Sequence, residues 1–206
     1  SYTAFSTLRA SLRGETATGG LVSRLIGLPG APGIDVILDG EGPVNGFAAR
    51  YRVTAGPIAS TEGTILLESI SPLAFAVEGN ADIDQVLPME TRPMVQGGVS
   101  YGFSANMNPT LTLLHLSALR MDSAVGGAKG DLKIRLDDLT VDARLSADLT
   151  RSELLVPLVP GLALKGAGVA ATFQGPISRL AARSSFWIQD VAIHGSRIAR
   201  AEATVD

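Results

Sequence analysis

The sequence contains no cysteine, so disulfide bonds and thiolate metal sites are excluded. Aromatic residues are scarce, at 5% of the 206 residues, and charged residues make up 18%, which is below the usual quarter. The formal net charge is −3 and basic residues form no cluster, which argues against a nucleic-acid-binding protein. The most apolar run, 154–164, is too short to span a bilayer and contains two prolines.

What the sequence does contain is 46% hydrophobic residues, spread along the whole chain. Apolar and polar residues alternate over four stretches, 47–54, 131–137, 139–148 and 180–188. A period of two is typical of a strand that turns one face to an apolar environment and the other to water. The pattern therefore predicts an all-β protein.

Short segments rich in glycine, proline and asparagine separate these stretches: "GPVNG" at 42–46, "NMNPT" at 106–110 and "QGPIS" at 174–178. Such turns join neighbouring antiparallel strands. We therefore expect an elongated antiparallel meander, curled into an open groove with a hydrophobic interior.

Three segments interrupt the alternation with helical spacing and each ends at a proline: 18–30, 82–88 and 150–157. In the third, Thr150 is followed three residues later by Glu153, the spacing of a capping box. We expect these segments to be short helical links between groups of strands.

The turn prolines Pro43, Pro109 and Pro176 lie 66 and 67 residues apart, and each follows a helical segment and a strand. Such a period is typical of a repeat array. The sequence predicts one array over 1–206, in which each unit holds about five strands and one helical link. The approximate units are 18–81, 82–149 and 150–206, the last of them truncated.

Residues with the spacing of a catalytic or metal site do not occur in the sequence. His115 and His194 share no metal-ligand pattern, and we interpret His115 as a strand residue satisfied by a local hydrogen bond. We predict that the protein is not an enzyme and holds no cofactor or metal. Three carboxylate pairs lie along single strands or turns and are interpreted as solvated charges: Asp35 with Asp39, Asp82 with Asp84, and Asp137 with Asp138.

Five segments together resemble the TamB family, within the AsmA-like group of bacterial envelope proteins. They are "LVSRLIGLPG", "LDGEGP", "GNADIDQVLP", "GDLKIRLDDLTVDARLSADL" and "LKGAGVAATFQGPISRLAA". The resemblance covers essentially the whole chain and implies a taco-like β-sheet with an apolar interior that conducts phospholipids. It also implies that this chain is an interior piece of a protein in the periplasm of a Gram-negative bacterium. The parent would be anchored in the inner membrane and would pair, through its other parts, with a TamA-like outer-membrane barrel of the Omp85 family.

Phospholipid acyl chains are therefore the expected ligand, in the service of lipid transport from the inner to the outer membrane and of outer-membrane biogenesis. Two alternatives stay open: a chaperone-like module that binds outer-membrane proteins or autotransporters by its sheet edge, and a structural β-solenoid passenger segment. The apolar side chains of the alternating stretches are the candidates to line the groove: Phe47, Tyr51, Val53, Ile134, Leu136, Val141, Leu145, Leu162, Leu164, Val169, Phe173, Phe186 and Ile188.

Overall fold

The computed structural model describes residues 7–20, 28–156, 158, 162–193 and 196–205. Within them, thirteen strands form a single sheet. The strands are β1 (Thr7–Thr16), β2 (Ile34–Pro43), β3 (Phe47–Ala55), β4 (Ala59–Ile70), β5 (Leu73–Asp82), β6 (Val99–Met107), β7 (Leu113–Asp122), β8 (Gly126–Arg135), β9 (Thr140–Leu149), β10 (Leu162–Ala163), β11 (Gly166–Pro176), β12 (Ala181–Ile193) and β13 (Ser196–Val205).

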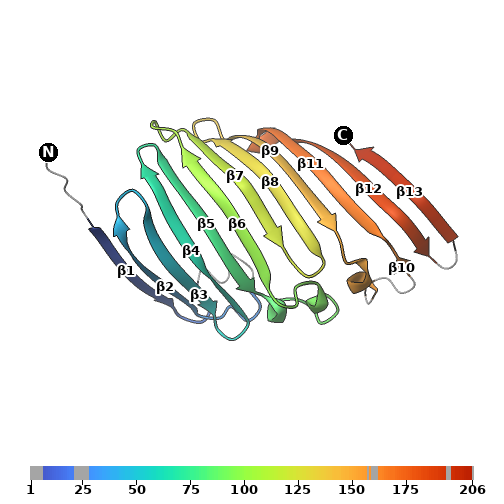
Figure 1. Cartoon of the computed structure of the whole chain (residues 1–206), viewed down its shortest axis with the longest axis horizontal. Coiled ribbons are helices and arrows are strands. Elements are labelled where there is room, and N and C mark those ends of the chain that lie inside the picture. The colour runs from blue at the N-terminus through green and yellow to red at the C-terminus, as the bar shows by residue number, and fades with distance from the viewer. Residues whose placement is uncertain (1–6, 21–27, 157, 159–161, 194–195, 206) are drawn as a thin grey trace.

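The sheet is an antiparallel meander in which each strand pairs with the next one along the chain. The short strand β10 is the single apparent exception, since it pairs with β12 in the same register as β11 does. β10 and β11 therefore occupy one position, interrupted at Leu164 and Lys165, and the thirteen strands fill twelve positions. Figure 1 shows the curled sheet open, with β1 at one end and β13 at the other.

The expected all-β meander with an open curled groove is confirmed. The predicted turns lie where the chain reverses, between β2 and β3, between β6 and β7, and between β11 and β12. Asn108 fixes the second of these turns, because its Oδ1 accepts hydrogen bonds from the backbone N–H groups of Thr112 and Leu113, both at 2.8 Å.

The helical links are shorter than expected and consist of 3₁₀ turns. The 82–88 region holds η1 (Asp84–Val86) and is followed by η2 (Arg92–Met94), while the 150–157 region holds η3 (Ser152–Leu155). A further turn, η4 (Ile177–Arg179), precedes β12. The central part of the 18–30 segment, residues 21–27, lies outside the described residues.

The predicted capping box of the third link is wrong. The residue that caps η3 is Arg151, and no side chain bonds the cap. The backbone N–H groups of Thr150 and Arg151 both donate to the carbonyl of Val125, at 3.0 and 3.1 Å, and the N–H of Val125 donates to the carbonyl of Met94. The turn between β7 and β8 thus connects η2 with the residues that precede η3 by backbone hydrogen bonds. These segments lie at the same ends of the strands (Figure 1).

The link regions recur every four strand positions, where the sequence suggested about five strands. They precede β2, β6 and the position shared by β10 and β11. Pro43 and Pro176 end β2 and β11, and Pro109 follows β6. Because neighbouring strands are antiparallel, an even number of strands per unit brings each link back to the same ends of the strands.

One row of directly paired residues crosses the whole sheet, and we call it the central row. Because cross-strand partners point to the same side of a sheet, these side chains define one face, which we call the apolar face; the opposite one is the polar face. The row is Leu12, Leu38, Tyr51, Gly63, Gly79, Tyr101, Met121, Ala128, Ala147, Val169, Phe186 and Ala203.

The 3₁₀ turns are far shorter than a bilayer-spanning helix must be, and the described part of the chain contains no helix with the length and hydropathy to span a membrane.

Candidate functional site: the apolar face

The apolar face is most tightly packed from β2 to β6, and it is more exposed on β1 and in its C-terminal half. Ile34 and Ala49 are buried at 6% and 3% exposure, and Ala105 on β6 is buried at 1%. Farther along the sheet, Leu145 and Phe186 are each 44% exposed. Large apolar side chains that are nearly half exposed on one continuous surface indicate a place where another apolar molecule can bind.

Two adjoining hollows occupy this exposed half. The first has a volume of about 540 Å³, and its lining includes Tyr101, Phe103, Leu119, Met121, Leu145 and Phe173. The second has a volume of about 470 Å³ and continues past Met121 to Phe186 and Ile188. Both are shallow and are lined mainly by apolar side chains, which suits a ligand with a long apolar body.

A pair of tyrosines bridges four strands in the packed half. Tyr51 on β3 pairs with Gly63, Gly63 with Gly79, and Gly79 with Tyr101 on β6. The two hydroxyl oxygens meet above the glycines at 2.5 Å. The tyrosines therefore reach toward each other across two strands that carry no side chain at this row.

The glycines are required because the tyrosine hydroxyls occupy the space of a side chain. A Cβ atom built on Gly79 would lie 2.3 Å from the Tyr51 hydroxyl oxygen and 2.8 Å from that of Tyr101. A Cβ on Gly63 would lie 2.7 Å from the Tyr51 hydroxyl oxygen and 2.0 Å from the carbonyl oxygen of Glu78. The tyrosine hydroxyls thus lie directly against the backbone of β4 and β5, and at this point no side chain of β4 or β5 rises above the sheet.

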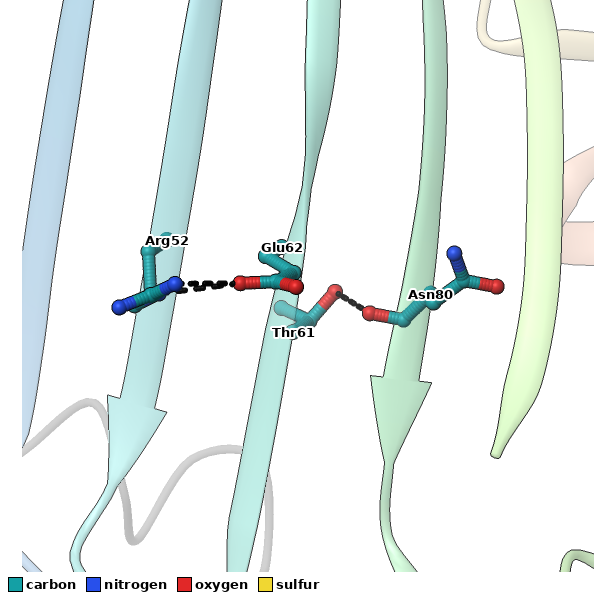
Figure 2. Close-up of polar contacts among 4 residues, drawn as sticks. All are labelled: Arg52, Thr61, Glu62 and Asn80. Carbon is teal, nitrogen blue, oxygen red and sulfur yellow. Dashed lines mark hydrogen bonds and ion pairs between the residues drawn. The ribbon is translucent and has the colours of Figure 1, made fainter. Parts of the chain in front are cut away.

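The tyrosine hydroxyls belong to a directed chain of hydrogen bonds. Thr61 Oγ1 donates to the carbonyl of Asn80 at 3.0 Å (Figure 2), so it can only accept from the Tyr101 hydroxyl, 2.6 Å away. The Tyr101 oxygen in turn accepts from Tyr51. Burial, followed by the hydrogen bond with Tyr101, raises the pKa of the Tyr51 hydroxyl well above its ordinary value. The cluster keeps its three protons inside the network.

The polar face carries pairs of opposite charge between neighbouring strands. Arg52 on β3 donates to Glu62 on β4 at 2.7 Å, as Figure 2 shows. Arg9 on β1 reaches Glu41 on β2 at 2.8 Å in the same manner. These pairs are solvent-exposed, so each contributes little to stability. Their charges identify this face as the one that is turned to water.

His115 lies on the polar face of β7, where its Nε2 is 2.7 Å from Asp131 Oδ2 on β8. His194 lies outside the described residues. Each of the three carboxylate pairs contains a residue that accepts a hydrogen bond, and in the pair of Asp82 and Asp84 the Asp82 Oδ1 accepts from the N–H of Asp84 at 3.5 Å. Asp39 accepts a hydrogen bond from Ser11 at 2.6 Å, and Asp138 accepts one from the N–H of Thr140. Hydrogen bonding with the side chain of Thr140, followed by that with its N–H, lowers the pKa of Asp138.

Most of the candidate groove residues lie together on the apolar face. Leu136 does not belong to a strand, since it follows β8 in the turn and its N–H donates to the carbonyl of Thr112. Leu164 lies between β10 and β11, and its carbonyl accepts from Ser152. Leu162 belongs to β10, and its side chain lies outside the description. The pairing puts on the apolar face Phe47, Tyr51, Val53, Ile134, Val141, Leu145, Val169, Phe173, Phe186 and Ile188.

Sequence reasoning missed several residues of the face, above all Leu119 and Met121 on β7. The apolar residues of β7 switch from even to odd positions between Leu116 and Leu119, and a strict alternation cannot follow that switch. In the structure the pairing shifts by one residue at this point, and Ala118 takes a φ of 51°. This bulge returns Leu119 and Met121 to the apolar face.

Comparisons with protein families, with curated proteins and with solved structures find no match to this chain. The family resemblance of its motifs therefore stays a prediction.

Proposed function

We propose that the apolar face binds the acyl chains of phospholipids and that the chain is part of a conduit for lipid transport between membranes. The observation that carries this proposal is the central row, which is free of charged side chains across all twelve strand positions. The two apolar hollows lie along the part of this row that runs from Tyr101 to Phe186.

The free energy of acyl-chain transfer supports this ligand. Each CH₂ group removed from water contributes about 0.8 kcal/mol, so a sixteen-carbon chain resists entering water by about 12 kcal/mol. A face that spans twelve strand positions is roughly 50 Å wide at the usual strand spacing. An acyl chain that moves along it stays in apolar contact without an energy source at each step.

A conduit also has to bind weakly at each point, because a firmly held lipid would not move on. Small aliphatic side chains such as Ala128, Ala147 and Val169 form the centre of the exposed half. The two hydroxyl groups of the central row, on Tyr51 and Tyr101, use their protons within the hydrogen-bond network that ends at Thr61 and the carbonyl of Asn80. Such a floor offers dispersion and hydrophobic contact along its length and few fixed polar anchors.

As part of the same proposal, the chain acts in the periplasm of a Gram-negative bacterium as an interior piece of a TamB-like protein anchored in the inner membrane. A TamA-like barrel of the Omp85 family would meet other parts of that protein. This assignment rests on the sequence resemblance, and the open apolar sheet is compatible with it.

The experiment pairs each change on the apolar face with the same change one residue away. Leu145→Asp and Phe186→Asp place a carboxylate on the apolar face, whereas Ser146→Asp and Ser185→Asp place it on the polar face of the same strands. Lipid that copurifies with each variant is identified by native mass spectrometry, and delipidated protein is then offered phosphatidylethanolamine. Circular dichroism monitors the fold.

We expect the two apolar-face variants to lose phospholipid and the two controls to keep it. Because Leu145 and Phe186 are nearly half exposed, their replacement should leave the fold intact. A wild-type chain that carries no lipid and takes up none would refute the proposal, and it would favour a passenger segment whose face is ordinary core.

A second candidate function follows from the sheet edges. β1 and β13 each pair with a single strand among the described residues, so each can offer backbone groups to an unfolded β-protein. In that case the Asp variants on both faces would bind an unfolded outer-membrane protein equally well.

A further inference from the structure

The polar face carries a hollow of its own, lined by positive charge. Three cations that lie far apart in the sequence come from different strands: Lys129 on β8, Arg144 on β9 and Arg183 on β12. They line one shallow hollow with a volume of about 460 Å³, and the pairing of their strands places all three side chains on the polar face. The fold thus concentrates positive charge in a chain whose formal net charge is −3.

The register of the strands sets two of these cations on either side of a small residue. Thr172 on β11 pairs with Arg144 in one direction and with Arg183 in the other. The two arginines are therefore two strand spacings apart, about 10 Å, and point to the same side of the sheet. Threonine is shorter than arginine, so both guanidinium groups can approach one ligand that lies above Thr172.

The charges of the hollow are not balanced by the chain itself. Lys129 and Arg144 form no ion pair with any described residue. Asp131 is paired directly with Arg144, but its Oδ2 lies 2.7 Å from His115 Nε2. No second carboxylate lines the hollow among the described residues. Three cations and one carboxylate leave an excess of two positive charges, which matches the charge of a phosphate monoester near neutral pH.

Lys129 also has a second cation as its partner on the neighbouring strand. It pairs directly with Arg120 on β7, and like charges in such positions repel each other. Arg120 extends away from it across Gly102, and its Nη2 donates to Glu78 Oε1 at 2.6 Å. An anion bound beside Lys129 would offset the repulsion between the two cations.

Hydroxyl groups complete the lining of the hollow. Ser146, Thr172 and Ser185 lie on the polar face, and none of their hydroxyls bonds to another described residue. Each hydroxyl can donate one hydrogen bond, and a guanidinium group presents paired N–H donors whose geometry matches the oxygens of a phosphate. The hollow can therefore offer one anion hydrogen-bond donors from several strands.

From these observations we infer that the hollow between Lys129, Arg144 and Arg183 is an anion site that takes a phosphate group, either as free phosphate or on the head group of a lipid in a membrane. The site lies on the polar face, whereas the proposed acyl-chain contacts lie on the apolar face. It is therefore independent of the proposed function, and either can fail without the other.

The test removes one cation from the hollow or one from elsewhere on the same face. Arg144→Gln and Lys129→Gln change the site. The matched control is Arg50→Gln, because Arg50 is an exposed polar-face arginine of β3 that forms no ion pair with a described residue. All three variants have the same net charge, and circular dichroism checks their fold.

Two probes distinguish the sources of the phosphate group. Inorganic phosphate is titrated into the isotope-labelled protein at constant ionic strength, and the Nε–Hε resonances of the arginines are followed by NMR. Cosedimentation with vesicles of phosphatidylcholine, with or without phosphatidic acid, tests a lipid head group.

We expect phosphate to shift the resonances of Arg144 and Arg183 together along one saturating curve. Arg144→Gln and Lys129→Gln should each weaken binding by about tenfold, whereas Arg50→Gln should stay within about twofold of the wild type. Binding confined to vesicles that contain phosphatidic acid, and weakened in the two site variants, would identify the lipid as the source.

A wild type that binds neither probe would overturn the inference, and so would an equal loss of binding in the site variants and in Arg50→Gln. Copurified phospholipid, measured on Phe186→Asp, reports on the proposed function alone, since Phe186 lies on the opposite face.

Discussion

Replacing Gly79 by alanine tests whether the tyrosine pair rests on the backbone of the sheet. The new methyl group would lie 2.3 Å from the hydroxyl oxygen of Tyr51 and 2.8 Å from that of Tyr101. The carbonyl oxygen of Glu62 would also be 2.8 Å away. All three distances are too short for a carbon atom, so both tyrosines have to move and the hydrogen bond between them is lost.

The size of the effect follows from two costs and one gain. Forcing a methyl group into a filled space costs about 1–3 kcal/mol, and losing the hydrogen bonds of Tyr51 and Tyr101 costs about 1 kcal/mol each. Alanine instead of glycine in a strand contributes about 0.5–1 kcal/mol in the opposite direction. We expect Gly79→Ala to lower the free energy of unfolding by about 2–4.5 kcal/mol, which is roughly 4–18 °C in the melting temperature for a chain of this length.

The assay is thermal and urea unfolding followed by far-UV circular dichroism. The matched control is Gly14→Ala, a strand glycine on the same face, where an added Cβ would have no atom within 4 Å. This control should be neutral or slightly stabilising. In a Tyr51→Phe, Tyr101→Phe background, which removes both hydroxyls, the cost of Gly79→Ala should fall to about 1 kcal/mol.

Two results would refute the reasoning. In the first, Gly79→Ala behaves like Gly14→Ala. In the second, the cost of Gly79→Ala is the same with and without the hydroxyl groups. The second result would assign the strain to the backbone contact with Glu62 rather than to the tyrosines.

Two further predictions concern the same network and one turn. Folding raises the pKa of Tyr51, so as the pH rises the unfolded chain loses this proton before the folded chain does. The free energy of unfolding should therefore decline as the pH rises above about 10. Tyr51→Phe should flatten that decline, measured by urea unfolding at a series of pH values. Asn108→Ala removes hydrogen bonds to two backbone N–H groups and to Thr112 Oγ1, and should lower the free energy of unfolding by about 1–2 kcal/mol in the same assay. The control is Asn45→Ala, at an exposed turn residue whose side chain bonds to no described residue; it should change the free energy of unfolding by less than about 0.5 kcal/mol. Equal effects of Asn108→Ala and Asn45→Ala would contradict the second prediction. A decline with pH that is as steep in Tyr51→Phe as in the wild type would contradict the first.

The sheet was predictable because its alternation is regular over most strands. From Thr140 to Leu149, for example, every second residue faces the apolar side and its neighbours are charged or hydroxylated. Local alternation fixes the face of each residue, and short turns fix the antiparallel order. These two rules were sufficient for the fold and for most of the face.

The rest depends on irregular pairing, which a single strand does not reveal. The sequence of β7 shows a switch in alternation between Leu116 and Leu119, but only its pairing with β6 and β8 shows that the switch is a bulge at Ala118 that keeps the apolar residues on one face. Likewise, the capping box at Thr150 failed because the N–H groups of Thr150 and Arg151 find a distant acceptor in Val125. Contacts between segments far apart in sequence override the local signal in both cases.

Three aromatic side chains fill the gaps that glycines leave in the surfaces of the sheet. Tyr51 and Tyr101 lie over glycines on the apolar face, and Trp187 does the same on the polar face, where a Cβ on Gly168 would lie 2.3 Å from its Nε1. An aromatic ring that covers a glycine fills the gap without rising far above the backbone. The hydroxyl protons of Tyr51 and Tyr101 are consumed within the network, so the ring pair adds apolar area and no free donor to the floor. The proposed passage of an acyl chain along this face would require both properties, and glycine opposite tyrosine supplies them together.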